Sequence, residues 1–243
     1  MSSFTFNGIS SDDLDIIITK PIVRPPWLPE VEYTPIPGHP RQLPHEKEWY
    51  PNKSFTIQAC MSDATPAKVQ QIYNTLRGYG TLIISTAENE VLNVYVEELD
   101  PNGVALLMAE FPITFCAEPF AYAAEAKSQS IMGDTVEVNN KGTAFVDPLI
   151  TFIASQATTT VTCNNVDMIV STPSEIVDAN YSSEYSITLD CEGELAYFTR
   201  PNGDKVSCTQ NTKGPFARLH NGKNYFTVQN VQAASIVYRE RWY

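Results

Sequence analysis

Residues able to catalyse a reaction or hold a metal are few in this 243-residue chain. Two of its three histidines, His39 and His45, lie six residues apart in a proline-rich stretch with no cysteine near them. A tetrahedral metal site would need two further ligands from elsewhere in the chain. We therefore expect no metal, and we interpret both histidines as exposed residues of that stretch.

The cysteines offer little more. The chain has five, with scattered spacing and no C-x-x-C pair: Cys60, Cys116, Cys163, Cys191 and Cys208. Such usage is typical of reduced, mostly buried thiols in a protein made in a reducing cytoplasm. A Cys–His nucleophile would need His220 beside Cys191 or Cys208, and both cysteines fall in strand-like stretches where an inert thiol is expected.

Two pairs of glutamates, Glu88/Glu90 and Glu97/Glu98, have a spacing that suggests general acid–base chemistry. Nothing apolar surrounds these carboxyl groups to raise a pKa, so we interpret them as solvated charges. The sequence also contains no G-x-S-x-G, H-E-x-x-H, Walker or dinucleotide-binding motif. We expect no catalytic residue, no cofactor and no enzymatic activity.

Composition favours a folded protein that repels nucleic acid. Apolar residues make up 43% and charged residues 18% of the chain, which is typical of a globular protein, and no apolar run is long enough to span a bilayer. The 28 acids outnumber the 16 bases, giving a net charge of −12. An acidic chain without a basic stripe is poorly suited to hold DNA by its phosphates.

The most unusual stretch is Arg24–Pro51, which holds eight of the 17 prolines. Proline fixes φ and removes backbone donors, so the stretch is expected to be extended, stiff and unable to enter a central sheet. It is also too apolar for a solvated linker. We predict an arm without regular structure that needs a surface to lie on. The candidate surfaces are its own domain and a neighbouring copy of the chain, and we favour the neighbouring copy. The residues expected at that interface are Arg24, Trp27, Tyr33, Ile36, Leu43, Trp49 and Tyr50.

After the arm, the sequence predicts one helix over residues 66–78. Thr65 offers a capping oxygen, Pro66 suits the first helical position, and Gly78 suits the stop. The helical spacing of the apolar residues predicts one stripe that packs on a sheet. Its members are Val69, Ile72, Tyr73 and Leu76.

The remaining pattern is almost entirely β. Hydrophobic periodicity is lost between Ala121 and Lys141, where a domain boundary is predicted. We expect an N-terminal domain over residues 1–132, a linker over residues 133–141, and a second domain over residues 142–243. Short, evenly spaced strands without a helix favour a β-sandwich for the second domain.

Several of these stretches together resemble the distal tail proteins (Dit family) of long-tailed, siphovirus-type bacteriophages. The first half contributes FTFNG, SFTI and FPITFCAEPFAY, and the second half contributes GTAFVDPLITF, ITLDCEGELAYF and FARLHNGKNYFTV. Near the end, the family pattern is matched by Pro215, Phe216, Leu219, Gly222 and Asn224. The resemblance covers nearly the whole chain, and the order of the elements is its most specific feature.

The resemblance implies a mainly β fold with an N-terminal split β-barrel, one helix and a long arm, followed by a galectin-like β-sandwich. It also implies a structural hub of the phage tail tip, which forms a ring, usually of six copies, whose arm clasps the adjacent subunit. The implied partners are the tail tube protein, a tail-associated hub or lysin protein, and receptor-binding or baseplate proteins. DNA would pass only in transit, and the protein would be a virion component made in the bacterial host cytoplasm.

Two other functions remain open. A carbohydrate-binding protein would contact host cell-wall sugar through the β-sandwich. A wall hydrolase is the enzyme alternative, which the lack of a catalytic motif disfavours.

Overall fold

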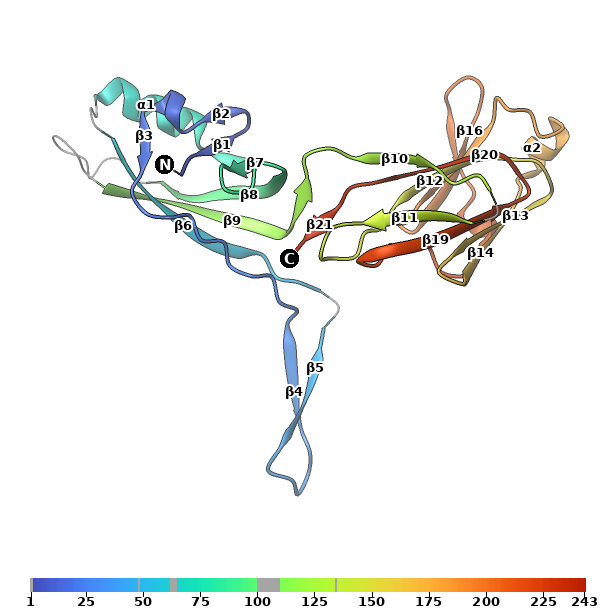
Figure 1. Ribbon diagram of the computed structural model, residues 1–243, viewed down its shortest axis with the longest axis horizontal. Helices are drawn as coiled ribbons and strands as arrows, with labels where there is room; N and C mark the ends of the chain where they lie inside the picture. The colour runs from blue at the N-terminus through green and yellow to red at the C-terminus, as the bar shows by residue number, and fades with distance from the viewer. Residues whose placement is uncertain (1, 48, 62–64, 100–109, 134) are drawn as a thin grey trace. The chain divides into compact units, whose positions relative to one another are not determined.

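The computed structural model describes residues 2–47, 49–61, 65–99, 110–133 and 135–243. The chain folds into two compact units (Figure 1). Met1–Ala124 and Tyr243 form the N-terminal unit, and Glu125–Trp242 form the C-terminal unit. Both are built from antiparallel strands, so the predicted mainly β class is confirmed. In the described part of the chain, no helix is long and apolar enough to cross a bilayer.

The N-terminal unit contains a curled, half-barrel sheet, as the split-barrel prediction requires. Seven strands follow in the order β2, β1, β7, β8, β9, β6 and β3. Their bounds are β1 Phe4–Phe6, β2 Ile9–Ser10, β3 Ile16–Ile18, β6 Lys53–Met61, β7 Gly78–Ile84, β8 Glu90–Leu99 and β9 Glu110–Ala123; a 3-10 turn, η1, covers Asp12–Leu14.

The alternation of buried and exposed side chains along the central strands explains why one face of this sheet packs on the core. In β6, every second side chain from Phe55 to Met61 is buried, and the intervening ones face away from the core. Phe115 of β9 lies at the centre, with ring centroids 5.9 Å from Phe4 and 5.9 Å from Phe55. A dense aromatic cluster therefore fixes which sheet face points inward.

The predicted helix is present as α1, Pro66–Thr75. The Thr65 hydroxyl accepts a hydrogen bond from the backbone N–H of Lys68 at 3.4 Å, and Ile72 and Leu76 are 1% exposed. The predicted end at residue 78 is wrong. Gly78 has a φ of +70° and begins β7, because only its left-handed conformation lets the chain turn directly from helix into strand.

The arm contains regular structure, contrary to the sequence-based expectation. Strands β4 (Val31–Pro35) and β5 (Gln42–Glu46) pair with each other as a two-stranded antiparallel sheet (Figure 1). The two strands join none of the larger sheets, which agrees with the prediction that proline keeps this stretch out of the central sheet.

The C-terminal unit is a sandwich of two sheets. The order is β10, β20, β12, β15, β16 and β17 in one sheet, and β11, β19, β13, β14 and β18 in the other. The bounds in the first are Lys127–Ser130, Val231–Tyr238, Leu149–Ala154, Ser186–Asp190, Leu195–Thr199 and Lys205–Ser207. Those in the second are Val136–Asn140, Gly222–Gln229, Thr158–Cys163, Val166–Ser171 and Thr212–Lys213. Two short elements complete the unit, the 3-10 turn η3 (Thr209–Asn211) and β21 (Arg241–Trp242).

Two sequence-based expectations fail in this unit. The stretch predicted as a linker contains β11, which pairs with β19 along five residues, so it belongs to the sandwich. Its valines alternate with polar residues over too short a span to be recognised as a strand from sequence. A short helix, α2 (Ser174–Asp178), also occurs where only strands and turns were expected, and it buries Ile176.

Candidate interaction sites

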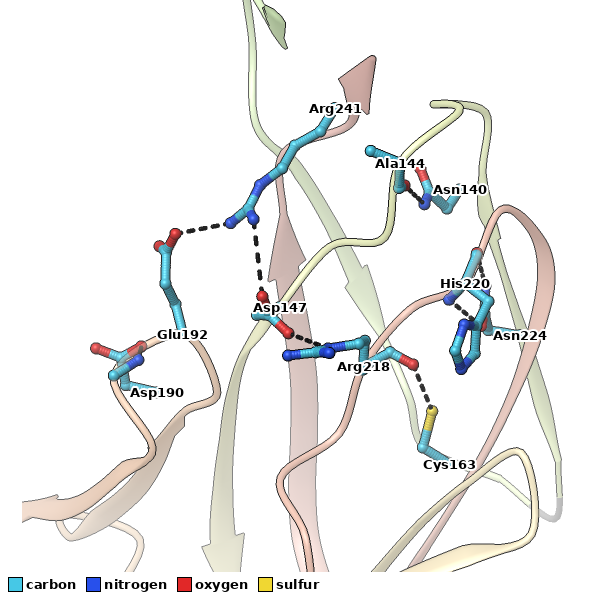
Figure 2. Close-up of polar contacts among 11 residues, drawn as sticks. Asn140, Ala144, Asp147, Cys163, Asp190, Glu192, Arg218, His220, Asn224 and Arg241 are labelled. Atoms are coloured by element: carbon cyan, nitrogen blue, oxygen red, sulfur yellow. Dashed lines mark hydrogen bonds and ion pairs between the residues drawn. The ribbon is translucent and has the colours of Figure 1, made fainter. Parts of the chain in front are cut away.

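The sulfur and imidazole groups of the C-terminal unit do not form a reactive pair in the described structure. Burial raises the pKa of Cys163 and Cys208 to about 11 and that of Cys191 to about 12. The Cys163 thiol donates to the backbone oxygen of Arg218 at 3.7 Å (Figure 2). His220 is exposed. These thiols stay protonated and are poor nucleophiles near neutral pH.

The arm histidines are separated by the hairpin geometry. His39 lies in the loop between β4 and β5, and its Nδ1 accepts a hydrogen bond from the backbone N–H of Arg41 at 3.2 Å. His45 lies in β5, opposite Glu32. Among the residues that the structure describes, no three His, Cys, Asp or Glu side chains converge on a point that could hold a metal.

Four charged residues of Figure 2, Arg241, Glu192, Asp147 and Arg218, form a structural network. Arg241 Nη2 lies 2.7 Å from a carboxylate oxygen of Glu192, and its Nη1 lies 3.7 Å from Asp147. Arg218 Nε donates to the other Asp147 oxygen at 2.8 Å. The Arg241 and Asp147 side chains are 8% and 11% exposed, so each buried charge is compensated by the other.

The family pattern near the chain end has a structural explanation. Asn224 is fully buried, and its side chain accepts from the backbone N–H of His220 at 2.9 Å and donates to the His220 oxygen at 2.8 Å. Gly222 takes a φ of +87° inside this turn, and Leu219 is buried in the core. Asn224, Gly222 and Leu219 of this pattern therefore specify the turn that enters β19.

The base of the arm is fixed within its own chain. Trp27 is only 2% exposed, and Arg24 Nη1 lies 2.7 Å from Glu90. Tyr50 donates to the hydroxyl of Tyr243 at 3.2 Å, and its ring lies 5.0 Å from that of Phe120. Burial and the bond to Tyr243 raise the pKa of Tyr50 to about 12. Trp27 therefore has no surface to offer a neighbouring copy, because its own chain already covers the side chain.

The rest of the arm is uncovered. All residues of β4 and β5 except Val31 are exposed. Tyr33 and Leu43 are each 60% exposed, Trp49 is 53% exposed, and Ile36 in the loop is 43% exposed. Four of the seven predicted interface residues thus remain available to a partner, and three hold the base of the arm. Sequence reasoning missed this division, because it depends on contacts with residues far along the chain.

A second candidate surface is the outer face of strands β6 to β9, opposite the aromatic core. Its charged side chains in the described part of the sheet are Glu97, Glu98 and Glu118, with no lysine or arginine at the outward positions. Tyr79 and Tyr95 are directly opposite each other on β7 and β8 and are 58% and 54% exposed. The face is therefore both acidic and open.

Neutral donors hold these three carboxylates in place. Ser54 Oγ donates to Glu97 at 2.7 Å, Thr114 Oγ1 donates to Glu98 at 3.5 Å, and Tyr79 Oη and Asn93 Nδ2 donate to Glu118 at 3.1 and 2.9 Å. A hydroxyl or amide fixes the position of a carboxylate without cancelling its charge. The face therefore presents ordered, uncompensated negative charge.

The C-terminal unit carries a shallow groove of about 340 Å³ on its six-stranded sheet. Its lining is uncharged and includes several hydroxyl groups. The lining residues are Ser130, Met132, Thr151, Phe152, Ile153, Ser186, Gln232, Ala233, Ala234 and Ser235.

These features define a class of fold: a curled N-terminal sheet with one packed helix and an exposed hairpin, followed by a two-sheet sandwich. The whole chain matches a solved structure of that class, with 100% of each chain covered, a TM-score of 0.75 and 15% sequence identity. That structure is the Dit protein (gp 19.1) of SPP1, described as a paradigm of the hub adsorption apparatus in phages that infect Gram-positive bacteria. The fold implied by the resemblance to distal tail proteins is therefore confirmed.

Two structures of the phage P2 baseplate in its activated conformation, with Ca and with Sr, also match. Each match covers 99% of this chain and 98% of the matched baseplate chain, at 7% sequence identity, with TM-scores of 0.49 and 0.47. The sequence matches no family model and no curated protein.

Proposed function

We propose that this chain is a structural hub protein of a phage tail tip, with no enzymatic activity, and that it assembles into a ring of six copies. The observation that carries the proposal is an arm with an anchored base and an uncovered hairpin that exposes Tyr33, Ile36 and Leu43, in a chain whose whole length has the fold of SPP1 Dit. A closed ring needs one patch that meets a different patch on the next copy, and such an arm supplies one of the two.

The ring would join the tail tube protein to a tail-associated protein and hold receptor-binding or baseplate proteins through the C-terminal units. It would be a virion component, made in the host cytoplasm. The two-sheet sandwich supports this placement, since it provides a second folded unit independent of the ring-forming one.

The acidic outer face of β6 to β9 would line the channel of the ring. Ordered carboxylates without cationic partners repel phosphates, so DNA would leave the tail without binding to the wall. The core side chains occupy the opposite face of the same sheet, which leaves this face free for a lumen.

The ring is tested by native mass spectrometry of the purified chain over a concentration series, with negative-stain images of the same samples. We expect a six-fold species. Replacing residues 32–45 by an Asn-Gly turn should leave a folded monomer, because the anchored base is retained. Tyr225→Ser is a matched control, since it removes a 48% exposed tyrosine from the other unit. A wild-type chain that stays monomeric even with its tail partners co-expressed would contradict the proposal.

The channel lining is tested with Glu97→Lys, Glu98→Lys and Glu118→Lys combined in one variant. We expect this ring to bind short duplex DNA at low salt, measured by fluorescence anisotropy, whereas the wild-type ring does not. The control carries the same charge change on exposed residues of the C-terminal unit, as Asp178→Lys, Glu184→Lys and Glu194→Lys. Equal DNA binding by the two variants would show that net charge, and not this face, is responsible.

Carbohydrate binding is the second candidate, and the observation that favours it is the uncharged groove, which is mainly apolar and includes hydroxyl groups. Isothermal titration calorimetry of the full chain with cellotetraose tests it, using Thr151→Val to remove one hydroxyl at nearly constant volume. Saturable heat that this variant abolishes would support a sugar site. If the chain does not bind this neutral glycan, the groove is not supported as a carbohydrate-binding site.

A further inference from the structure

The backbone of the arm hairpin has a defined hydrogen-bonding pattern. The N–H of Lys47 donates to the carbonyl of Glu30 at 2.7 Å, so this pair directs its backbone groups into the hairpin. In an antiparallel ladder, every second residue pair directs its backbone N–H and C=O groups toward the partner strand. The residue pairs between them direct these groups away from the hairpin. The register continues this alternation through both strands.

The outward pairs contain both prolines of the ladder. Tyr33 is opposite Pro44, and Pro35 is opposite Gln42. Because proline lacks an N–H, β4 loses one outward donor and β5 loses the one at its centre. Each edge then keeps only two outward N–H groups, too few for an added strand of ordinary length.

The side chains, in contrast, leave both faces of the hairpin open, with exposed apolar groups among polar ones on each face. Cross-strand partners share a face, so Tyr33 lies beside Pro44 on one face and Leu43 lies beside Thr34 on the other. Tyr33 and Leu43 are each 60% exposed. A two-stranded ribbon is marginally stable alone, so covering both faces would contribute most to ordering it.

The tip of the hairpin indicates which partner covers it. Residues 36–41 include Arg41 and His39 but no acidic residue, in a chain with 28 acids and 16 bases. Another copy of the chain is therefore electrostatically attractive to the tip. Ile36, 43% exposed, adds an apolar contact at the same end.

We propose that the arm inserts between two surfaces of the next copy and is held by both of its faces, instead of adding to a sheet edge as an extra strand. Tyr33 anchors one face and Leu43 the other, with Ile36 at the tip. This inference rests on the proposed ring and adds the mode of contact between its subunits.

The first experiment places the photo-crosslinker p-benzoylphenylalanine at position 33 or, separately, at position 43 of the full-length chain. We expect both positions to give covalently linked copies of the chain at similar yield, because both faces are covered. Crosslinking from only one position would overturn docking through two faces.

The second experiment separates face contact from strand addition. Val31→Pro with Glu46→Pro removes further outward N–H groups, and it should leave ring formation within about twofold of wild type. Tyr33→Ser with Leu43→Ser keeps all backbone donors, and it should raise the concentration at half-assembly by about tenfold or more. Glu32→Pro with His45→Pro is the control that breaks the hairpin itself, since these residues direct their N–H groups inward.

The outcomes distinguish this inference from the ring proposal. If wild type forms rings but the outward proline pair abolishes them while the serine pair does not, strand addition is the correct mode and only the present inference fails. If wild type forms no ring and gives no crosslink at either position, both fail.

Discussion

Two groups of carboxylates, one in each unit, are held in opposite ways. On the outer sheet face of the N-terminal unit, the hydrogen bonds that Glu97, Glu98 and Glu118 accept from the described residues come from neutral groups. In the C-terminal unit, Asp147 and Glu192 are paired with arginines. The first arrangement preserves negative charge at a surface, and the second cancels it inside the fold.

The difference shows why a count of acidic residues says little about their role. A carboxylate that contributes to folding is recognised by a nearly buried cation beside it, as Arg241 lies beside Asp147. A carboxylate that contributes a surface field is ordered but left uncompensated. The contrast can be tested by removing charged groups from the buried ion pairs and from the acidic sheet face.

The largest expected effect is from Arg241→Met. This change leaves the nearly buried carboxylate of Asp147 without one of its two cations and the exposed carboxylate of Glu192 without its arginine. It should lower the free energy of unfolding by about 3 kcal/mol, mainly through Asp147. Urea denaturation of the full chain measures it. Lys223→Met is the control, because it removes an exposed cation from Glu137 and should have a much smaller effect on the free energy of unfolding. Equal losses would break the contrast between buried and exposed pairs.

An intermediate effect is expected at alkaline pH. Burial raises the pKa of Cys191 from 9.0 to about 12, so the folded state binds this proton more tightly than the unfolded chain. That contribution to stability is complete below pH 9 and is lost as the pH rises toward 12. Cys191→Ala should flatten this part of the stability–pH curve, followed by circular dichroism in urea. A slope unchanged by the substitution would assign the loss to other groups.

The smallest expected effect is from Glu118→Gln. The amide still accepts a hydrogen bond from Tyr79 or Asn93, so the free energy of unfolding should change by no more than about 0.5 kcal/mol. Urea denaturation measures it alongside Arg241→Met. A loss above about 1 kcal/mol would mean that this carboxylate stabilises the fold, and would weaken its assignment to a channel wall.

Local patterns predicted much of the fold. The alternation in β6, the cap at Thr65 and the density of prolines each act within a few residues, and each is readable from the sequence. The end of α1 was misplaced because Gly78 suits both a helix stop and the first residue of a strand. The order of elements gave the family resemblance, and the structural match confirms its fold.

The candidate sites were less predictable because they depend on distant contacts. Trp27 has the residue type of an interface anchor, yet its own chain buries it. The sequence did not show which carboxylates form the acidic face, because β8 and β9 are paired through two register shifts, one of which falls between Val96 and Glu98 and brings Glu97 and Glu98 to the same face. Such a register shift cannot be predicted from the sequence of one strand, because it depends on how the two strands pair.

The prolines of the hairpin have a consequence for the chain before it assembles. A newly made copy exposes an apolar ribbon, and exposed ribbons of this kind promote aggregation by pairing edge to edge. Pro35 and Pro44 interrupt both edges while leaving Tyr33 and Leu43 accessible. The same two residues would therefore keep a pool of free subunits soluble in a crowded cell until the correct partner surface is presented.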